Sequence, residues 1–351
     1  MVSDVRTLPV GSRVVVRWRL SAPDPATGAT LTDSVGTLVA ADEVGLSVET
    51  ARGLVTIPLE RVTAAKEVPP RPTRRGPAHL ALSTQDLQRV MAPGWGAVEQ
   101  ESLGEWQLRA SAGFTQRANS ALPVGDPGMP LSEAVDAVES WYAARGLPAK
   151  LTLAGPVGFD AAEDPLGAVL LDRGYRVGSL TMALTAATAT VAAADPGGPE
   201  VLTSADLDEA WLDTYRDTRT TVPAVTETVL TGSPRQVFGQ IRPGGGLSQQ
   251  LGLRSATAAG TRPVAVARLG LAAGWAGLGA VWTDPAYRGR GLAAHLTARL
   301  AELAHHDGVL MMHLQVEHDN ETALRLYHRL GFETHSAYAF LTQARSGSPK
   351  P

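Results

Sequence analysis

A run of arginine and glycine residues in the C-terminal half of the chain joins an expected strand to an expected helix. In VWTDPAYRGRGLAAHLTARLAEL, residues 281–303, a strand ends before a proline and a helix follows two closely spaced glycines. Glycine lets backbone N–H groups approach a bulky anion, and a helix N-terminus adds the positive end of its dipole. The pattern predicts a pyrophosphate-binding loop formed by Arg288, Gly289, Arg290, Gly291, Leu292 and Ala293.

Two other phosphate-binding loops are excluded by the same residues. No Gly-Lys-Ser/Thr sequence follows the glycines, so the run is not a P-loop. The Gly-x-Gly-x-x-Gly spacing of a dinucleotide-binding fold is also missing. An ordinary helix start is the remaining alternative.

A second motif follows the first, with the spacing Asn-x-x-Ala-x-x-x-Tyr-x-x-Leu-Gly-Phe from Asn320 to Phe332. Together the two motifs span residues 281–332, and they resemble the GCN5-related N-acetyltransferase (GNAT) superfamily. The resemblance implies that the arginine–glycine loop binds acetyl-CoA as a co-substrate. It also implies that Asn320 binds the pantetheine arm or adjacent backbone, and that Tyr327 protonates the departing CoA thiolate. The backbone that would bind the acetyl and pantetheine groups belongs to Val281, Trp282 and Thr283.

The chemistry of acetyl transfer agrees with these residue types. Transfer from a thioester to an amine needs a neutral amine, a donor for the oxyanion and an acid for the thiolate, but no metal. A tyrosine, with a pKa of about 10, can donate a proton to a developing thiolate. A backbone N–H at a strand edge can hold the tetrahedral oxygen. An ordinary packing role is the alternative for Tyr327.

The general base is less clearly marked. In the expected strand LMMHLQVEHDN, a period of two places His313, Gln315 and Glu317 on one face. Protein N-terminal-alanine acetyltransferases of the superfamily often have a glutamate where Gln315 stands, and a glutamine cannot accept a proton at neutral pH. Glu317 is the candidate base, acting directly or through water, against the alternative of a solvated carboxylate. Glu227 is a weaker candidate, and His313 is a candidate for lining the acceptor cleft.

Composition excludes several other classes of site. The chain has no cysteine, so disulfides, a cysteine nucleophile and a thiolate zinc site are ruled out. Seven of the eight histidines lie between His295 and His335, but no spacing completes a set of ligands, so no metal site is expected. The net charge of −4 gives no field that would attract nucleic acid or a membrane.

A soluble, cytoplasmic protein is expected. The N-terminal residues lack the apolar core and cleavage site of a secretory signal. The apolar stretch 263–283 contains Arg268 and four glycines, which favours two strands joined near Gly274 over a membrane helix.

Two low-complexity stretches divide the chain into three folded segments. The three expected folded segments are an all-β barrel at 1–66, a GNAT-like lobe without catalytic residues at 79–184 and a catalytic GNAT domain at 200–343. A proline-rich linker at 67–78 and a second linker at 185–199 join them, and a disordered tail is expected at 344–351. The barrel resembles an SH3-like domain, and its balanced charge favours a structural or protein-docking module over a nucleic-acid-binding one.

Residues 200–343 are expected to form an α/β domain with a mixed sheet. A helix is predicted at 205–219, opened by Ser204, and strands are predicted at 249–256, 263–272 and 276–283. In the segment before it, FTQRANSALPV is predicted as a strand. The helix end Arg173-Gly174-Tyr175 is similar to Leu330-Gly331-Phe332, but Leu170 stands in place of Tyr327. This difference indicates a tandem copy that has lost its catalytic residues.

The sequence therefore predicts an acetyl-CoA-dependent N-acetyltransferase that acts on a small-molecule amine, for example an amino acid such as glutamate. The order of domains resembles an actinobacterial group linked to N-acetylglutamate synthase activity. Protein N-acetylation and a non-catalytic acyl-CoA sensor are the alternatives. Tyr327 argues against a sensor, which needs no acid for a thiolate.

Overall fold

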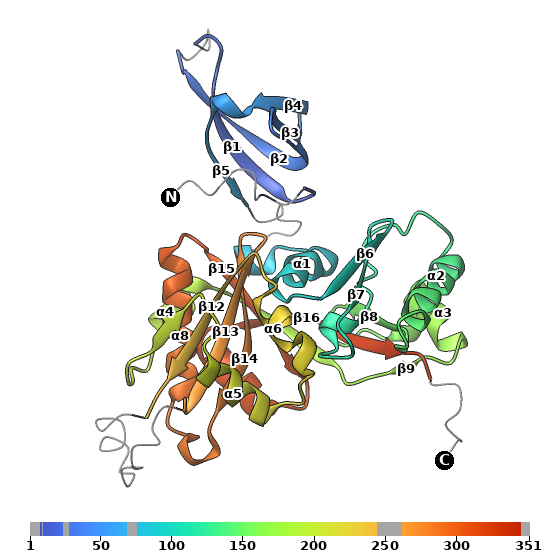
Figure 1. Ribbon diagram of the computed structural model, residues 1–351, viewed down its shortest axis with the longest axis vertical. Helices are drawn as coiled ribbons and strands as arrows, with labels where there is room; N and C mark the ends of the chain where they lie inside the picture. The colour runs from blue at the N-terminus through green and yellow to red at the C-terminus, as the bar shows by residue number, and fades with distance from the viewer. Residues whose placement is uncertain (1–7, 9, 24–27, 69–75, 244–261, 345–351) are drawn as a thin grey trace. The chain divides into compact units, whose positions relative to one another are not determined.

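The computed structural model describes residues 8, 10–23, 28–68, 76–243 and 262–344. The chain forms two compact units, residues 1–71 and 72–351 (Figure 1). The strand expected at 249–256 and most of the expected tail lie outside the described residues.

The first unit is all-β, as expected. Its strands form one antiparallel sheet in the order β4-β3-β2-β1-β5. Alternate residues such as Val14 and Val16 point into a small apolar core with Leu38 and Leu46. The strand bounds are β1 Arg13–Arg19, β2 Leu31–Ala41, β3 Gly45–Thr50, β4 Gly53–Pro58 and β5 Val62–Glu67.

The second unit is built on one mixed sheet with the order β11-β12-β13-β14-β15-β10-β16-β8, and β9 pairs with β16. Its strands are β8 Lys150–Gly155, β9 Arg176–Val177, β10 Thr181–Ala187, β11 Leu202–Ser204, β12 Arg235–Ile241, β13 Ala265–Ala272, β14 Trp275–Thr283, β15 Met311–Glu317 and β16 Glu333–Thr342. A separate hairpin is formed by β6 Glu99–Leu103 and β7 Trp106–Ala110. The helices are α1 Thr84–Met91, α2 Leu131–Ala143, α3 Pro165–Asp172, α4 Thr188–Ala193, α5 Glu209–Thr218, α6 Pro223–Thr231, α8 Leu292–His306 and α9 Glu321–Arg329.

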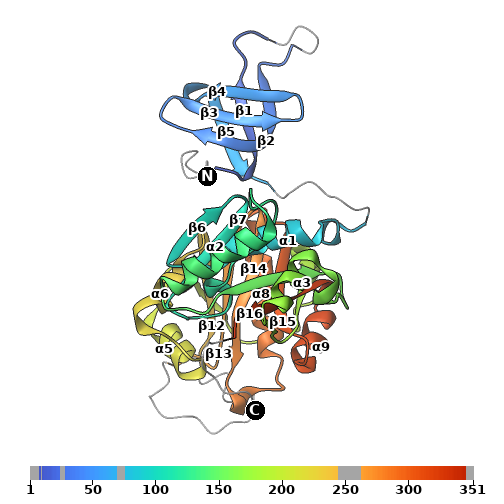
Figure 2. The ribbon, with the colours of Figure 1, turned by 90° about the vertical axis from the view of Figure 1, so that its right-hand side faces the viewer.

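Helices cover both faces of the sheet because the side chains of each strand alternate between the faces. On β13, Ala265 and Ala267 belong to the core that contains residues of α4, α8 and α9. Val266, between them, belongs to the core of α5 and α6. Figure 2 shows α5 and α6 on the opposite side of these strands from α9. The apolar stretch 263–283 is thus two strands, and no helix in the described ranges is long and apolar enough to span a membrane.

The two halves of the second unit exchange their last strands. Strand β10, from the first half, lies between β15 and β16, while β16, from the second half, pairs with both β10 and β8. The segment 185–199, expected to be a linker, contains the end of β10 and helix α4, which packs on α8. The halves therefore share one sheet.

The ends of α3 and α9 have the same geometry, as the internal similarity suggested. Gly174 and Gly331 both have positive φ angles, of +80° and +91°. The N–H of Tyr175 donates to Leu170 O at 3.0 Å, and the N–H of Phe332 donates to Tyr327 O at 3.0 Å. Both helices end in a Schellman motif, which needs glycine after the last turn.

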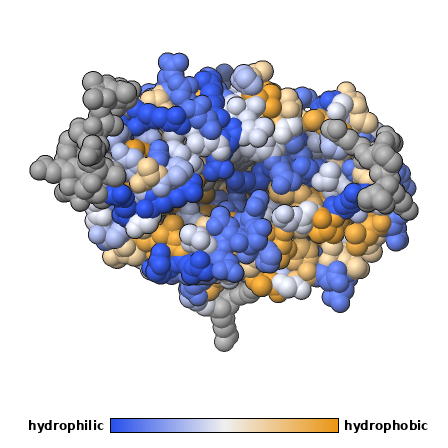
Figure 3. All heavy atoms as spheres, turned by 90° about the horizontal axis from the view of Figure 1, so that it is seen from below, coloured by the Kyte–Doolittle hydropathy of each residue, from blue (hydrophilic) through white to orange (hydrophobic). Residues whose placement is uncertain are grey.

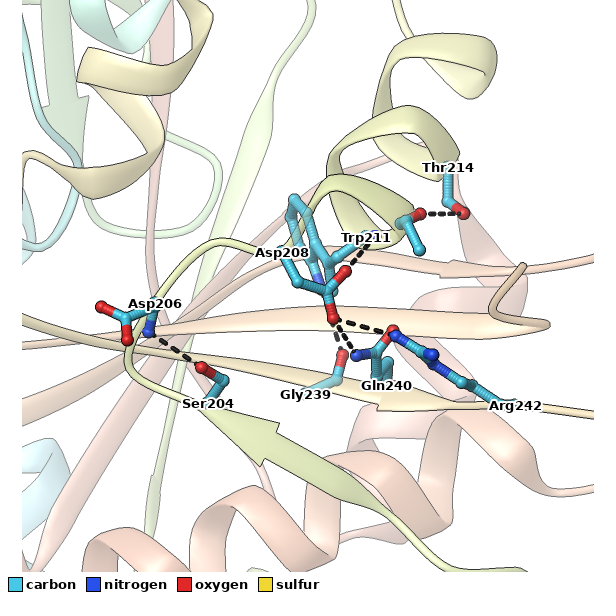
Figure 4. A network of polar contacts seen from close by, with 9 residues as sticks. Ser204, Asp206, Asp208, Trp211, Thr214, Gly239, Gln240 and Arg242 are labelled. Carbon is cyan, nitrogen blue, oxygen red and sulfur yellow. Dashed lines mark hydrogen bonds and ion pairs between the residues drawn. The ribbon is translucent and has the colours of Figure 1, made fainter. Parts of the chain in front are cut away.

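Local predictions fail where side chains cap the backbone. Residues 114–124 are not a strand: they contain a short 3₁₀ helix, Arg117–Asn119, and only isolated bridges at Ala121 and Leu122. The helix predicted from Ser204 begins later, since the carboxylate of Asp208 accepts from the N–H of Trp211 at 2.7 Å (Figure 4). Strand β12 and helix α6 were not predicted.

Candidate active site

The site lies where two parallel strands of the sheet separate. Pairing between β14 and β15 runs from Trp275 and Met311 to Leu278 and Leu314 and then stops, although β14 continues to Thr283. A bulge at Ala280, with φ +54°, turns the end of β14. Backbone N–H and C=O groups beyond Leu278 therefore face an opening instead of a neighbouring strand, and such groups bind ligands well.

The opening is a cavity of about 1220 Å³. Figure 3 shows hydrophilic side chains around a hollow in the face of the molecule seen from below. Pockets for one small molecule usually measure ~300–1,000 Å³, so this cavity has room for two substrates. The predicted site residues that line it are Val281, Trp282, Thr283, Arg288, Gly289, Gly291, Leu292, Ala293, Glu317, Asn320 and Tyr327.

The arginine–glycine loop forms one wall of the cavity. Gly289 and Gly291 have φ angles of +74° and +79°, and α8 starts directly after Gly291. A Cβ atom on Gly289 would meet nothing within 4 Å, and one on Gly291 would meet only Pro196 Cγ at 3.9 Å. The loop is thus open on its glycine side and lies beside a helix N-terminus, which is a fit for a pyrophosphate. Arg290 is not among the residues that line the cavity.

Tyr327 also lines the cavity, from α9. Its ring packs edge-on against Phe332, with the centroids 5.7 Å apart. Burial raises the pKa of Tyr327, so its hydroxyl stays protonated and can act only as a proton donor. The structure gives Asn320 a local role, since its Oδ1 caps α9 by accepting from the N–H of Ala323 at 3.1 Å. Only the amide NH₂ of Asn320 is then available for a ligand.

The three polar residues of β15 differ in their access to the cavity. His313 does not line it: the residue is only 4% exposed, and burial lowers its pKa to about 3. The prediction that His313 lines the acceptor cleft is therefore wrong, because His313 lies opposite Gly277, where the strands are still paired. Gln315 and Glu317 follow the point of separation and line the cavity. Glu227 lies on α6, paired with Arg216 at 3.1 Å and outside the cavity.

Comparison with known proteins identifies the family. The family model described as "Probable histone acetyltransferase Rv0428c C-terminal" matches residues 83–341. The chain belongs to this family. The first unit matches a second model, "Rv0428c N-terminal Sm-like domain", over residues 8–66. A small all-β domain is confirmed, but the SH3-like resemblance and the link to N-acetylglutamate synthase are not.

Several known proteins are similar to this acetyltransferase. "Uncharacterized N-acetyltransferase YobR" of Bacillus subtilis (strain 168) is 26% identical over 72% of the chain and 96% of its own length. "Probable histone acetyltransferase Rv0428c" of Mycobacterium tuberculosis is 31% identical over 39% of the chain and 42% of its own length. A solved tandem GNAT protein from the clavulanic acid biosynthesis pathway matches with a TM-score of 0.50 at 16% identity, over 78% of the chain and 91% of that protein. The chain thus has a GNAT fold and is an acetyltransferase.

The structure adds residues of the acetyltransferase's first half that sequence reasoning missed. Trp95, Thr115, Gln116 and Arg117 line the same cavity, together with Arg219. The ring of Trp95 reaches the bulge of β14, where a Cβ on Gly279 would meet Trp95 Cζ3 at 3.2 Å. The one sequence signal for them is the polar run FTQRANS, within the stretch for which the sequence predicts a strand.

Proposed function

We propose that this acetyltransferase transfers the acetyl group of acetyl-CoA to the amine of a small molecule, for example an amino acid such as glutamate. The observation that carries the proposal is the separation of β14 from β15, which opens onto both the arginine–glycine loop and Tyr327. The cavity therefore brings together an anion-binding loop, the unpaired edge of β14 and a proton donor.

The residues of the chain would hold acetyl-CoA along the walls of the cavity. Backbone N–H groups at the start of α8 bind the pyrophosphate, with charge from the flanking arginines. The unpaired edge of β14 binds the pantetheine arm and the acetyl oxygen, and the Asn320 amide reaches the same arm. The proposed binding residues are Val281, Trp282, Thr283, Arg288, Gly289, Arg290, Gly291, Leu292, Ala293 and Asn320.

The reaction would proceed by direct attack. The nitrogen of the neutral amine forms a bond to the thioester carbonyl carbon, and the carbon–sulfur bond breaks. The proton lost by the amine passes to Glu317, directly or through water. Tyr327 gives a proton to the leaving sulfur. Among the described residues that line the cavity, Glu317 is the single carboxylate, which favours it as the base.

Replacement of Tyr327 by phenylalanine tests the proposal. The change keeps the ring and its packing on Phe332 but removes the hydroxyl, so kcat should fall by about 10²–10⁴-fold. The acetyl-CoA Kd should change little, because the hydroxyl acts mainly in the transition state. Tyr175→Phe is the control, since the Tyr175 hydroxyl bonds to Glu139 at 3.0 Å outside the cavity. A fall of less than threefold in single-turnover rate would refute the assignment of Tyr327.

Protein N-acetylation is the second candidate, and the description of the matched family favours it. In that case the first unit could serve as a docking module for a protein partner. A free-CoA release screen across amino acids, polyamines, histone and peptides separates the two candidates. Activity confined to proteins or peptides would replace the small-molecule acceptor.

A further inference from the structure

A loop from the first half of the second unit lines the cavity through Thr115, Gln116 and Arg117. We call residues 111–120 the Arg117 loop. Buried Asn119 holds it: its Oδ1 accepts from the N–H groups of Ser111 and Gly113, both at 2.8 Å. Its Nδ2 donates to Phe114 O at 2.7 Å and Thr115 O at 2.8 Å.

The backbone of the Arg117 loop is also strained. Thr115 has a φ angle of +58°, in the left-handed region that β-branched residues rarely adopt. The hydroxyl of Thr115 accepts from Trp95 Nε1 at 3.1 Å, which ties the loop to the cavity wall. Strain of this kind persists only where surrounding contacts enforce it, and it concentrates at ligand-binding sites. The loop is therefore pre-organised to present Arg117.

Two arginines from different halves of the unit line the cavity, and the charge of each acts on Tyr215. The Arg117 guanidinium lies over the ring of Trp95, 4.7 Å from its centroid. The Arg219 guanidinium lies 5.5 Å from the centroid of Tyr215, and it donates to Val281 O on the edge of β14 at 3.2 Å. Within the described part of the chain, neither arginine forms an ion pair with a carboxylate.

Two buried arginines behind them add to the positive charge. Arg109 donates to the carbonyl and hydroxyl oxygens of Ser120, and Arg268 donates to Leu230 O and Gly94 O. These acceptors are all neutral. Burial, together with the nearby Arg117, lowers the pKa of both Arg109 and Arg268 to about 10, so both remain charged at neutral pH. Charge that is withdrawn from water without a counter-ion is costly, and an anionic ligand offsets that cost.

We propose that the acceptor is an amine that carries a carboxylate, in the chemical class of amino acids, and that Arg117 and Arg219 bind this carboxylate. The inference rests on the proposed function and names the substrate class of the same cavity. Guanidinium groups bind carboxylates through paired, charge-assisted hydrogen bonds. A lysine-rich peptide would instead be repelled by the same groups.

The other end of the acceptor has its own partner on β15. Gln315 Oε1 is buried without a hydrogen-bond partner among the described residues, and Gln315 lines the cavity. A carbonyl oxygen can accept from the N–H of a neutral amine. With the carboxylate on the arginines, the amine then lies on Gln315, beside Glu317 and the edge of β14 where the thioester is attacked.

The test compares matched acceptors with and without the charge. Full-length protein, acetyl-CoA and a panel of amino acids are assayed for CoA release beside the corresponding amino acid amides. Wild type should prefer the acids. Arg117→Gln should raise KM for an acid by about 10–100-fold with kcat nearly unchanged. Arg219→Gln should raise the same KM by a similar factor, and its kcat is assessed separately because Arg219 also bonds to Val281 O. KM for the amides should not change. Arg176→Gln, an exposed arginine of β9 outside the cavity, is the control.

A binding experiment makes the result independent of turnover. Calorimetry of the CoA-loaded protein with N-acetyl amino acids and their amides should show saturable binding of the acids, weakened in both variants. Absence of binding by every acid at millimolar concentration, or acceptors found only among polyamines and lysine-rich peptides, would overturn the inference. In the latter case CoA release would still support acetyl transfer, so failure of the inference is distinct from failure of the proposed function.

Discussion

Replacement of Asn119 by alanine should loosen the Arg117 loop and leave the rest of the acetyltransferase folded. Of the four hydrogen bonds lost, those with the N–H of Ser111 and the carbonyl of Phe114 are buried, and those with Gly113 and Thr115 reach water in part. A buried group left without its partner costs about 1–3 kcal/mol, whereas the partly exposed groups can bond to water. With two such buried groups, the free energy of unfolding should fall by about 2–6 kcal/mol.

Urea unfolding followed by tryptophan fluorescence measures this loss, with the m-value checked for constancy. The acceptor KM should rise, because Arg117 is no longer held in place. The acetyl-CoA Kd should stay the same, since the arginine–glycine loop belongs to other elements. Gln116→Ala, an exposed residue of the same loop, is the control for stability. A loss below about 0.5 kcal/mol, the range of ordinary surface changes, would refute the claim that Asn119 holds the loop.

Two further predictions concern the arginine–glycine loop and the start of α5. Gly291→Glu should abolish acetyl-CoA binding in calorimetry, because it places a negative side chain where the pyrophosphate binds. Gly291→Ala adds only ~1–2 kcal/mol of backbone strain and should weaken binding modestly. Equal affinity in folded Gly291→Glu protein would contradict the assignment. Burial raises the pKa of Asp208, but hydrogen bonds from the Trp211 N–H and Gln240 and the charge of Arg242 outweigh it and lower that pKa below its usual value (Figure 4). The Asp208 carboxylate therefore stabilises the fold above its unfolded pKa, and this contribution is lost as the pH falls through the lower, folded pKa. Asp208→Asn should be less stable than wild type by about 0.2–1 kcal/mol at pH 7. The difference should shrink as the pH falls through the lowered pKa of Asp208, and a difference independent of pH would exclude the charge as its source.

The sequence by itself determined the parts of this protein that depend on neighbours along the chain. The arginine–glycine loop needs only Gly289 and Gly291 at positive φ before a helix, and these residues are consecutive with it. The first unit followed from alternating apolar residues and turn residues, and the matched ends of α3 and α9 followed from Gly174 and Gly331. Local backbone preferences decide such features, so contiguous residues are sufficient to predict them.

Only the tertiary structure decided which distant residues share the cavity. The exchange of β10 and β16 brings the two halves into one sheet, and no local pattern specifies which edge a strand will pair with. His313 and Gln315 lie on one face of β15, yet of these two only Gln315 lines the cavity. The reason is that β14 and β15 separate after Leu314, which stands between them. Arg117 lines the cavity from a strained loop that Asn119 holds through hydrogen bonds, and its single 3₁₀ turn leaves no periodic pattern in the sequence. The acceptor end of the site therefore depends on long-range packing between the halves.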